Sequence, residues 1–434
     1  MNVTVNATGF AAERQRIAVI GAGISGLASA YLLASRHAVT LYESQPTLGG
    51  HSNTVDVTVG DQTHPVDTGF LVYNERTYPN LIRLFAELGV QSHRSEMSFG
   101  VSLDGGRTEW AGTNLDSVFA QRSHLLSPAF LGMLGDVMRF NREAMGNLLT
   151  ARQSSLTLGE LLDRGRYGRR FREAYLLPMV AAIWSSGRQD VLQFPAETFL
   201  QFALNHGLLQ ITDRPQWLTV AGGSRSYVDR IRGQLQDVRA NLPVQQIRRG
   251  ERGVAVTTAL GSEWFDAVVF ATHAPTTLQL LVDALPEERA ALAPVRYQSN
   301  LAVLHCDPSL LPRRRKVWSA WNYLGRSRGE EGSQVCVSYL INKLQPLPFS
   351  IPIVVTLNPV VPPDPSLEFA RFSYEHPILD AGALLAQASL PGVQGRHRAW
   401  FAGAWTGYGF HEDGLKSALR VAAAFGAAPS WAVL

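Results

Sequence analysis

The sequence has 434 residues, of which 46% are hydrophobic and 17% charged, and its formal net charge is +3. This composition is typical of a globular protein of two or three domains, and the small charge, without a zinc-finger or similar motif, argues against a nucleic-acid partner. The two cysteines, Cys306 and Cys336, lie far apart in apolar segments. We therefore expect free thiols in a reducing cytoplasm and no disulfide framework.

The first predicted unit is a strand, a helix and a second strand. Residues 17–20 form an apolar run typical of a buried parallel strand, residues 27–34 repeat apolar side chains at helical spacing, and residues 39–42 are again strand-like. Residues 17–34 carry no charge, which is also a property of a secretion signal or a membrane span. The stretch contains three glycines, has no basic segment before it and no cleavage pattern after it, so we favour the βαβ unit.

The glycines of this unit have the G-x-G-x-x-G spacing of a dinucleotide-binding loop. In such a loop Gly21 permits the tight turn, Gly23 lets the backbone approach a pyrophosphate, and Gly26 lets the helix pack on the strand. Glu43 ends the second strand, where a carboxylate can accept both ribose hydroxyls. The segment therefore predicts a dinucleotide site formed by Gly21, Gly23, Ile24, Ser25, Gly26, Glu43 and Ser44.

The next segments predict loops beside the cofactor and a long helical region. A Gly49-Gly50 loop precedes His51, residues 67–69 form an Asp-Thr-Gly turn, and residues 78–88 form an amphipathic helix that Gly89 ends. Residues 127–207 show mostly helical spacing of Leu, Phe and Met.

A sheet resumes after a further helix, which we expect at residues 227–235. The proline-rich stretch 346–365 predicts an edge strand followed by a loop. Near the C-terminus, we expect a strand at 400–402 and a helix at 415–425, just after Asp413-Gly414. The other strands expected from β-branched and aromatic residues are 244–247, 254–258, 267–271, 301–305, 317–323, 335–341 and 353–357.

Taken together, the segments GAGISGLASAYLL, DTGFLVYNERTYPNL, GGSRSYVDRI and FAGAWTGYGFHEDG resemble the FAD-dependent amine oxidase superfamily. That superfamily includes monoamine oxidase, protoporphyrinogen oxidase and phytoene desaturase. Within it, the chain is most similar to a bacterial group known as predicted NAD/FAD-binding or amine-oxidase-like proteins. The resemblance extends over the whole chain.

The resemblance implies an α/β fold of two domains. A Rossmann-like FAD-binding domain would be built from the discontinuous segments 15–95, 215–285 and 396–434. An α+β substrate domain with a mixed sheet and a helical subdomain would comprise residues 96–214 and 286–395. Within the substrate domain, the expected helical part is 127–207 and the expected sheet part is 296–360.

The resemblance also implies a set of FAD contacts. The glycine loop would hold the pyrophosphate, Glu43 the adenosine ribose, and His51 would lie along the ribityl chain. The last helix would point its N-terminus at the flavin, where the reduced ring carries negative charge. Besides the residues of the βαβ unit, the implied contacts are Gly49, Gly50, His51, Gly69, Phe70, Val244, Ala271, Thr272, Gly403, Asp413, Gly414 and Leu415.

The chain departs from the family pattern in three ways. His51 stands where monoamine oxidase relatives have arginine, and Trp405 stands where they have an acidic residue. No lysine can be placed as the partner of the flavin N5 atom. We therefore expect FAD without expecting amine oxidation to follow from the family name. No cysteine matches a flavin-linking position, so we expect non-covalent binding.

The candidates for catalysis are His411 and Tyr73. His411 lies in the segment that approaches the flavin in the family, and Tyr73 follows the Gly69 loop, where it could line the flavin or pack in the core. His206 and His273 are weaker candidates, because a lone histidine is more often a structural hydrogen-bonding group than a base. No metal-binding spacing, G-x-S-x-G elbow or Walker A lysine occurs, so we expect no metal site and neither hydrolase nor kinase chemistry.

Aromatic residues suggest an apolar substrate, although an ordinary aromatic core is the equal alternative. They are Trp184, Trp217, Trp318, Trp321, Tyr323 and Trp405. The basic run 313–316 beside Trp318 permits peripheral contact with the inner face of a membrane, and a solvated loop is the alternative.

The function we expect is an FAD-dependent oxidoreductase that oxidises or desaturates a long-chain unsaturated fatty acyl group or an isoprenoid by hydride transfer to flavin N5. The alternatives are an amine oxidase, a redox-neutral flavin-dependent double-bond isomerase, and a non-catalytic FAD-binding partner subunit. The sequence leaves open the electron acceptor, which would be oxygen or a redox partner.

Overall fold

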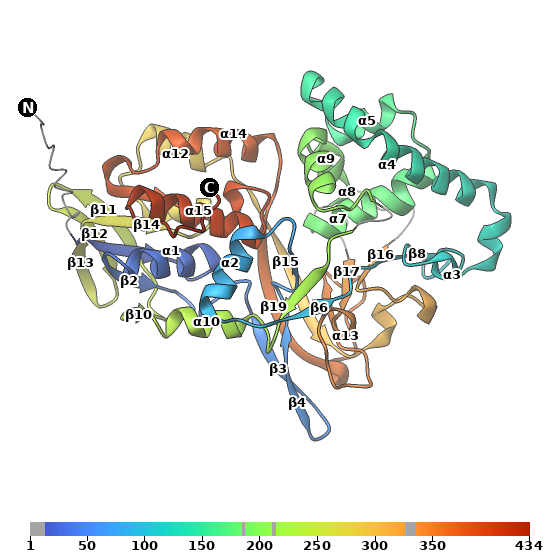
Figure 1. Cartoon of the computed structure of the whole chain (residues 1–434), viewed down its shortest axis with the longest axis horizontal. Helices are drawn as coiled ribbons and strands as arrows, with labels where there is room; N and C mark the ends of the chain where they lie inside the picture. The colour runs from blue at the N-terminus through green and yellow to red at the C-terminus, as the bar shows by residue number, and fades with distance from the viewer. Residues whose placement is uncertain (1–13, 185–186, 211–213, 326–335) are drawn as a thin grey trace, which may run out of the picture.

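The computed structural model describes residues 14–184, 187–210, 214–325 and 336–434. Figure 1 shows two parts side by side: a parallel sheet with helices on both faces, and a mixed sheet beneath a group of helices. This arrangement confirms the predicted fold class.

The parallel sheet has five strands in the order β10-β2-β1-β14-β20. It contains the predicted βαβ unit, in which β1 and β2 flank helix α1 (Ile24–Ala34) and pair in parallel. The inner strands form because their residues are apolar and fully buried, as in the Ala-Val-Val-Phe sequence of β14. The strands are β1 (Arg16–Ile20), β2 (Ala38–Tyr42), β10 (Asp237–Arg239), β14 (Ala267–Phe270) and β20 (Ala399–Phe401).

Helices and a small antiparallel sheet cover this parallel sheet. Helix α1 packs against the C-terminal helix α15 (His411–Ala424), and α15 also packs against α2 (Pro79–Leu88). Gly89 ends α2 with a φ of 69°, as the sequence predicts. The other elements of this part are α10 (Arg225–Arg232), β11 (Gln246–Gly250), β12 (Gly253–Thr258), β13 (Gly261–Phe265), α11 (Ala274–Leu280), α12 (Pro286–Leu292) and α14 (Ala381–Ser389).

The mixed sheet has seven strands in the order β19-β15-β18-β17-β16-β7-β8. Only the β16–β7 pair is parallel among its described pairs. The strands are β7 (Phe99–Leu103), β8 (Thr108–Ala111), β15 (Tyr297–His305), β16 (Trp321–Gly325), β17 (Cys336–Leu340), β18 (Val354–Leu357) and β19 (Glu368–Pro377).

Four predictions in these regions are wrong. Strand β18 is not an edge strand, because β15 and β17 pair with its two sides and the prolines fall outside the paired residues. Val317 lies in a short 3₁₀ turn and not in a strand. Val244 precedes its strand, which begins at Gln246. The last helix begins at His411, so Asp413-Gly414 lies inside it rather than before it. The predicted strand start at Val335 lies outside the described residues.

The helical group confirms the prediction for residues 127–207. Helix α4 (Pro128–Ser154) buries Phe130, Phe140 and Leu148 on one face, and a π-helical turn joins α6 to α7. The shorter helices are α5 (Leu158–Arg164), α6 (Arg169–Phe171), α7 (Leu177–Trp184), α8 (Arg188–Gln193) and α9 (Ala196–Asn205). Among the described helices, none is long and apolar enough to cross a membrane.

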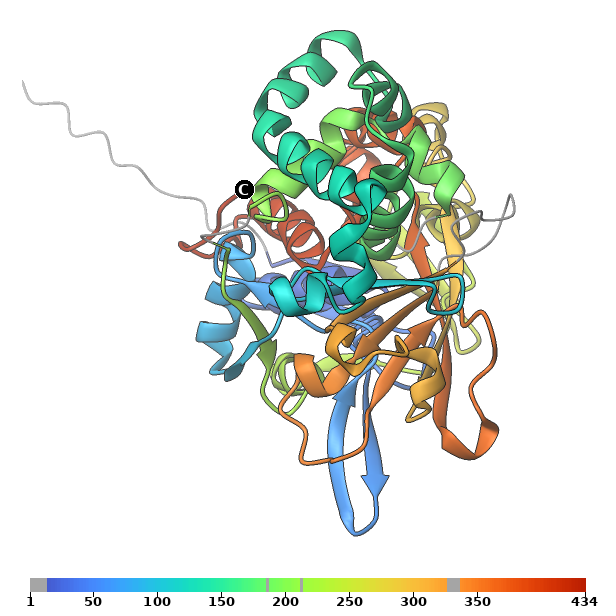
Figure 2. The same ribbon diagram turned by 90° about the vertical axis from the view of Figure 1, so that its right-hand side faces the viewer.

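Short strands connect the two parts. A hairpin of β3 (Thr54–Val59) and β4 (Gln62–Asp67) projects from the molecule in Figure 2. A three-stranded sheet in the order β5-β9-β6 packs against α2, where the ring of Tyr73 lies 5.3 Å from that of Phe85. Its strands are β5 (Tyr73–Asn74), β6 (Ser92–Ser95) and β9 (Trp217–Val220), and the short helices α3 (Leu115–Val118) and α13 (Ile341–Leu344) complete the described strands and α-helices.

Candidate functional site

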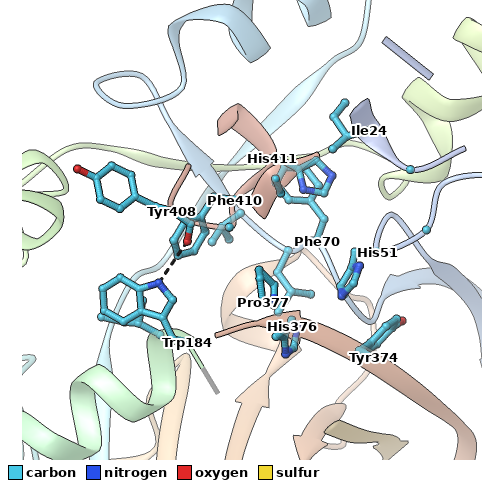
Figure 3. A pocket seen from close by; sticks show the side chains of 18 of the residues that line it. Ile24, His51, Phe70, Trp184, Tyr374, His376, Pro377, Tyr408, Phe410 and His411 are labelled. Carbon is cyan, nitrogen blue, oxygen red and sulfur yellow. Dashed lines mark hydrogen bonds between the residues drawn. The ribbon is translucent and has the colours of Figure 1, made fainter. Parts of the chain in front are cut away.

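A continuous cavity of about 940 Å³ connects the two parts of the molecule. One end lies at the carboxyl edge of the parallel sheet, where strands β1 and β2 end. The other end lies among α7, α9 and the mixed sheet. The carboxyl edge of a parallel sheet is where open α/β folds bind their ligands. Figure 3 shows the middle of the cavity, with side chains converging from several elements.

The three loop glycines have three different structural reasons to be glycine. Gly21 has a φ of +97°, and a Cβ atom there would lie 2.8 Å from the carbonyl oxygen of Ala271. A Cβ atom on Gly26 would lie 1.8 Å from the carbonyl oxygen of Gly21, so α1 could not pack as it does. A Cβ atom on Gly23 would meet no atom within 4 Å, and Gly23 lines the cavity.

The open space at Gly23 lies at the N-terminus of α1. Gly23 is the N-cap residue of that helix, and none of the described side chains caps the helix. Uncapped backbone N–H groups and the positive end of the helix dipole form a site for phosphate. The loop therefore fits the diphosphate of a dinucleotide, because the absence of a side chain at Gly23 lets the phosphates approach the backbone.

Glu43 lies at the same end of the cavity, with its carboxylate held by backbone donors. Its Oε2 atom accepts the N–H of Ala22 at 2.7 Å, and its Oε1 atom accepts the N–H of Gln45 at 2.9 Å. Oε1 also accepts the hydroxyl of Ser44 at 3.1 Å, so three bonds fix the carboxylate at the end of β2, and Oε2 keeps a lone pair for a further donor. This is the geometry that recognition of ribose hydroxyls requires.

The cavity brings together most of the residues that the sequence predicts for cofactor binding. Those that line it are Gly21, Gly23, Ile24, Ser25, Glu43, Ser44, Gly49, Gly50, His51, Gly69, Phe70, Val244, Ala271, Thr272 and Gly403. Gly26 and Leu415 are not among the lining residues and pack inside instead. Asp413 accepts the N–H of Phe410 and so caps α15, while Gly414 lies against Ile24 and Ser25 of α1.

The two candidates for catalysis lie in different environments. Tyr73 is not among the lining residues: its side chain is 2% exposed, its hydroxyl bonds that of Ser92, and its ring packs against Phe85. His411 does line the cavity, and its ring stacks on Phe70 with 3.6 Å between centroids.

The surroundings of His411 suit a neutral ring. Its Nε2 atom lies 2.9 Å from the Ser52 hydroxyl oxygen and 3.2 Å from the Tyr227 hydroxyl oxygen. Burial lowers the pKa of His411 to about 3. A ring with so low a pKa is a weak base. His411 is therefore better suited to line the cavity beside Phe70 than to accept a proton.

The histidines considered weaker candidates also line the cavity. His206 stacks on Phe202 at 3.8 Å, and its Nδ1 atom lies 3.0 Å from that residue's carbonyl oxygen. Burial lowers the pKa of His206 to about 4. His273 stacks on Tyr297 at 4.2 Å. Both rings pack against an aromatic neighbour.

Strand β19 contributes four cavity residues that the sequence reasoning missed, namely Tyr374, Glu375, His376 and Pro377. Tyr374 stacks on His51 at 4.9 Å, and the ring of His376 lies 5.2 Å from that of His51 (Figure 3). The signal was present, because Phe372, Tyr374 and His376 alternate along the chain as the side chains on one face of a strand do. The neighbouring proline-rich stretch obscured it.

The far end of the cavity is aromatic. Trp184 donates its indole N–H to the carbonyl oxygen of Tyr408 at 3.2 Å, and its ring lies 4.7 Å from that of Phe202. Phe202 in turn stacks on Phe410 at 5.0 Å. Of the aromatic residues expected around a substrate, Trp184, Trp217, Trp321 and Trp405 line the cavity, whereas Trp318 and Tyr323 are not among the lining residues.

Charged groups are few along the described lining. The lining acids are Glu43, Glu96 and Glu375, and the Glu96 carboxylate bonds Lys343 at 2.9 Å and Ser98 at 2.6 Å. Arg214 is the lining cation, and neither a lysine nor an aspartate belongs to the described lining.

Residues 24–309, more than half of the sequence, match the family described as flavin containing amine oxidoreductase. The chain belongs to this family. It is a flavoprotein oxidoreductase by family, and its cofactor is FAD. The observed cavity agrees, because its first end has the glycine loop, the uncapped helix and the fixed carboxylate that a dinucleotide needs.

Curated relatives match this chain over part of their length. Coproporphyrinogen III oxidase of Mycobacterium leprae is 27% identical over 66% of this chain and 65% of its own. Carotenoid phi-ring synthase of Streptomyces griseus is 27% identical over 70% of this chain and 60% of its own. The chain thus spans less than two thirds of each relative.

Among solved structures, the CLA-producing fatty acid isomerase from P. acnes shares the fold. It superposes with a TM-score of 0.68 at 15% identity and covers 95% of this chain and 98% of its own.

The described residues form no cluster of three or more His, Cys, Asp or Glu side chains suited to a metal ion. The two cysteines are free thiols, and neither lines the cavity.

Proposed function

We propose that this protein binds FAD non-covalently along the cavity and oxidises or desaturates a hydrophobic substrate with a long unsaturated chain. FAD would lie with its diphosphate on Gly21 and Gly23, its adenosine ribose on Glu43, and its ring system between His51 and the Phe70–His411 pair. When bound, FAD supplies a hydride acceptor, the flavin N5 atom. The remaining contacts would come from the lining residues named above, with Val244 at the adenine.

The residues of the chain would position and shield the reactants. The N-terminus of α1 and the carboxylate of Glu43 orient the two ends of the nucleotide. The stacked rings of Phe70 and His411 form a flat surface that keeps water from one side of the cavity. The aromatic group around Trp184 and Phe202 holds an apolar chain by van der Waals contact at the far end.

The observation that carries this proposal is the chemistry of the aromatic end. An ammonium group taken from water into an apolar cavity needs a carboxylate partner. The Glu96 carboxylate already bonds Lys343, Glu375 is exposed, and Glu43 lies at the nucleotide end. An amine substrate would therefore lack a buried counter-ion among the described lining residues, whereas a hydrocarbon chain needs none.

Arg214 favours a fatty acyl substrate over an isoprenoid hydrocarbon. It lines the cavity, is exposed to solvent, and donates its Nε–H to the carbonyl oxygen of Gln210 at 2.7 Å. The rest of its guanidinium can bind the carboxylate of a fatty acid whose chain lies among the aromatic rings.

The test is an anaerobic titration of the FAD-loaded protein, following the absorption band of oxidised flavin. Unsaturated fatty acids, isoprenoids and amines are added in turn, and air is then admitted. We expect bleaching by the unsaturated fatty acids, and a raised half-saturating concentration in Arg214→Gln with the plateau unchanged. Bleaching by amines alone would refute the proposal. No bleaching but a shifted double bond in the product would identify an isomerase, and neither change with any compound would favour the partner-subunit alternative.

We further propose that the protein takes its substrate from a lipid surface, through the outer face of α4. Leu131, Met138, Met145 and Leu149 on that helix are all exposed. Their spacing of seven, seven and four residues places them along one face of the helix. An exposed apolar face of this length is unusual on a protein surface that water alone covers.

This apolar face adjoins both the cavity and a basic region. On its inner side, the ring of Phe130 lies 6.5 Å from that of Trp110, which lines the cavity. Leu126, which is 88% exposed, stands just before α4. Cations at this end of the molecule would attract anionic headgroups. They include Arg122 and Lys316, which both form ion pairs with Asp116.

We place such contact on α4 and the turn before it, and not on the basic run 313–316. Within the basic run 313–316, Arg314 bonds the buried Glu109 at 2.7 Å and Arg315 lies over the Trp318 ring. Trp318 donates its indole N–H to the carbonyl oxygen of Pro312. The tryptophan is therefore held by the protein, and the exposed apolar side chains of α4 and the turn before it become the candidates for insertion.

Co-sedimentation with vesicles of phosphatidylglycerol and phosphatidylcholine tests this surface. We expect wild-type protein to bind, and a Leu126→Asp, Met138→Asp variant to lose most of its binding. The control is Leu260→Asp, because Leu260 is 83% exposed in the β12–β13 turn at the opposite end of the molecule. Equal binding by wild type and both variants, or no binding by wild type, would refute the proposal.

A further inference from the structure

His376 occupies a central position in the cavity and has no role in the function proposed above. It lies in β19 and lines the cavity beside His51, with 5.2 Å between the two ring centroids (Figure 3). Its Nδ1 atom lies 2.9 Å from the side-chain nitrogen of Asn300, a fully buried residue of β15. The remaining question is which ring nitrogen of His376 carries the proton.

The protonated nitrogen of His376 follows from a chain of hydrogen bonds that starts at a backbone N–H group. The N–H of Leu301 can only donate, so the atom of Asn358 that lies 2.9 Å from it is the side-chain oxygen. The amide nitrogen of Asn358 then donates to the side-chain oxygen of Asn300 at 2.7 Å. The amide nitrogen of Asn300 must therefore face His376.

A second acceptor fixes the same amide independently. The side-chain nitrogen of Asn300 also lies 3.1 Å from the carbonyl oxygen of Gln298, which can only accept. Two backbone groups, one a donor and one an acceptor, thus set the orientation of Asn300 from opposite ends. Asn300 presents an N–H to Nδ1 of His376, so Nδ1 accepts and the ring proton lies on Nε2.

The described residues give His376 a hydrogen bond at Nδ1 and none at Nε2, so the Nε2–H group of this cavity-lining side chain is a donor open to a bound molecule. Protonation of Nδ1 would bring two donors face to face, which disfavours the charged ring. Burial acts in the same direction and lowers the pKa of His376 to about 4. His376 is therefore neutral near pH 7, with its donor nitrogen fixed.

We propose that His376 is a permanent hydrogen-bond donor to an acceptor atom of the bound flavin ring, and that Asn300 and Asn358 are positioning residues that hold the proton on Nε2. This inference rests on the FAD placement proposed above. We assign the donor to the flavin and not to the substrate because of its position relative to the nucleotide loop. Gly50 lies close to that loop, since a Cβ atom on Gly50 would lie 3.2 Å from the Cα atom of Gly23. His51 follows Gly50 and packs against His376. The donor thus lies on the path that leads away from the nucleotide loop.

Such a donor would stabilise the electron-rich reduced flavin more than the oxidised flavin. It would thereby raise the reduction potential of the bound flavin, and a neutral donor does so without a buried charge. A typical neutral hydrogen bond changes an equilibrium constant by about fivefold. Loss of the donor is therefore expected to favour the oxidised flavin by about that factor.

The experiment compares His376→Leu, which removes the donor, with His376→Gln, which keeps an N–H group. His93→Leu makes the same exchange as the first variant at an exposed position of β6 outside the cavity. For each protein we would measure FAD content, the melting temperature and the midpoint potential of the flavin without substrate. We expect a lower potential in His376→Leu, and potentials close to the wild type in His376→Gln and His93→Leu.

The tautomer is tested separately, on wild-type protein with ¹⁵N-labelled histidine. Nuclear magnetic resonance distinguishes a protonated ring nitrogen from an unprotonated one, and we expect the proton of His376 on Nε2 with or without FAD. A proton on Nδ1 would overturn the inference.

An unchanged potential in His376→Leu, in protein that has kept its FAD, would also overturn it. If only the response to substrate changed, the donor would serve the substrate, and the assignment to flavin would be wrong. Wild-type protein that cannot be loaded with FAD would instead refute the proposed function, while leaving the tautomer result valid.

Discussion

Replacement of Gly23 by alanine should separate cofactor binding from stability. A Cβ atom at this position meets nothing within 4 Å, and the backbone has a φ of −71°, which alanine adopts freely. As an N-cap residue, alanine is less favourable than glycine by about 0.5–1.5 kcal/mol. Alanine also reduces the conformational entropy of the unfolded chain, which stabilises the native state by about 0.4–1 kcal/mol. The two effects oppose each other, so the stability of the FAD-free protein should change by no more than about 1 kcal/mol.

FAD binding should respond very differently. The methyl group would occupy the space into which we place the diphosphate, and we expect FAD to bind about 100-fold more weakly. At free FAD of 100 times the wild-type Kd, the cofactor stabilises the native wild type by about 2.7 kcal/mol. The same FAD concentration would stabilise the Gly23→Ala variant by only about 0.4 kcal/mol.

The assay is thermal unfolding of each protein with and without FAD, together with a direct titration of FAD. Gly132→Ala is the matched control, because a Cβ atom on this exposed residue of α4 also meets nothing within 4 Å. It should leave the effect of FAD unchanged. If Gly23→Ala bound FAD as tightly as the wild type, the open space beside Gly23 would not be the diphosphate site.

Three further substitutions test other parts of the structure. Gly26→Ala should destabilise the FAD-free protein by more than about 2 kcal/mol in thermal unfolding, because the new Cβ atom would lie 1.8 Å from the carbonyl oxygen of Gly21; an unchanged melting temperature would contradict this. Glu412→Ala should lower the free energy of unfolding in urea by about 1–3 kcal/mol, because it removes the acceptor of the backbone N–H groups that begin α2. Burial raises the pKa of Asp67 from 3.8 to about 6, so the native state binds the proton more tightly than the unfolded chain. As the pH rises from 4 to 6.5, the wild type should therefore lose up to about 3 kcal/mol of stability relative to Asp67→Asn, and a difference that does not vary with pH would refute the assignment.

The nucleotide end of the cavity could be predicted from the sequence because its determinants are local. The turn at Gly21, the helix after Gly23 and the acid at Glu43 belong to one short βαβ unit, in which spacing alone fixes the geometry. The aromatic environment was predicted in part, since Trp184 and Trp321 line the cavity, whereas Trp318 is held by Pro312. Composition indicated an apolar site without distinguishing the cavity from the core.

The middle of the cavity could not be predicted because it depends on long-range pairing. His376 and Asn300 meet only because β19 and β15 pair as antiparallel neighbours. Tyr73 was a reasonable candidate by its closeness in sequence to Gly69, but its hydroxyl bonds Ser92, and its ring packs in the core. Closeness along the chain shows which loop a residue follows and not which way its side chain points.

The parallel sheet takes its strands from widely separated stretches of the chain, and this affects how the protein emerges from the ribosome. Strand β14 pairs with β1 on one side and with β20 on the other, and β20 comes from residues 399–401. Until those residues leave the exit tunnel, the outer edge of β14 has no partner, and α1 lacks the helix α15 that covers it. From the synthesis of β14 until that of β20, the nascent chain therefore carries an open, apolar sheet edge, which favours slow folding and binding by chaperones.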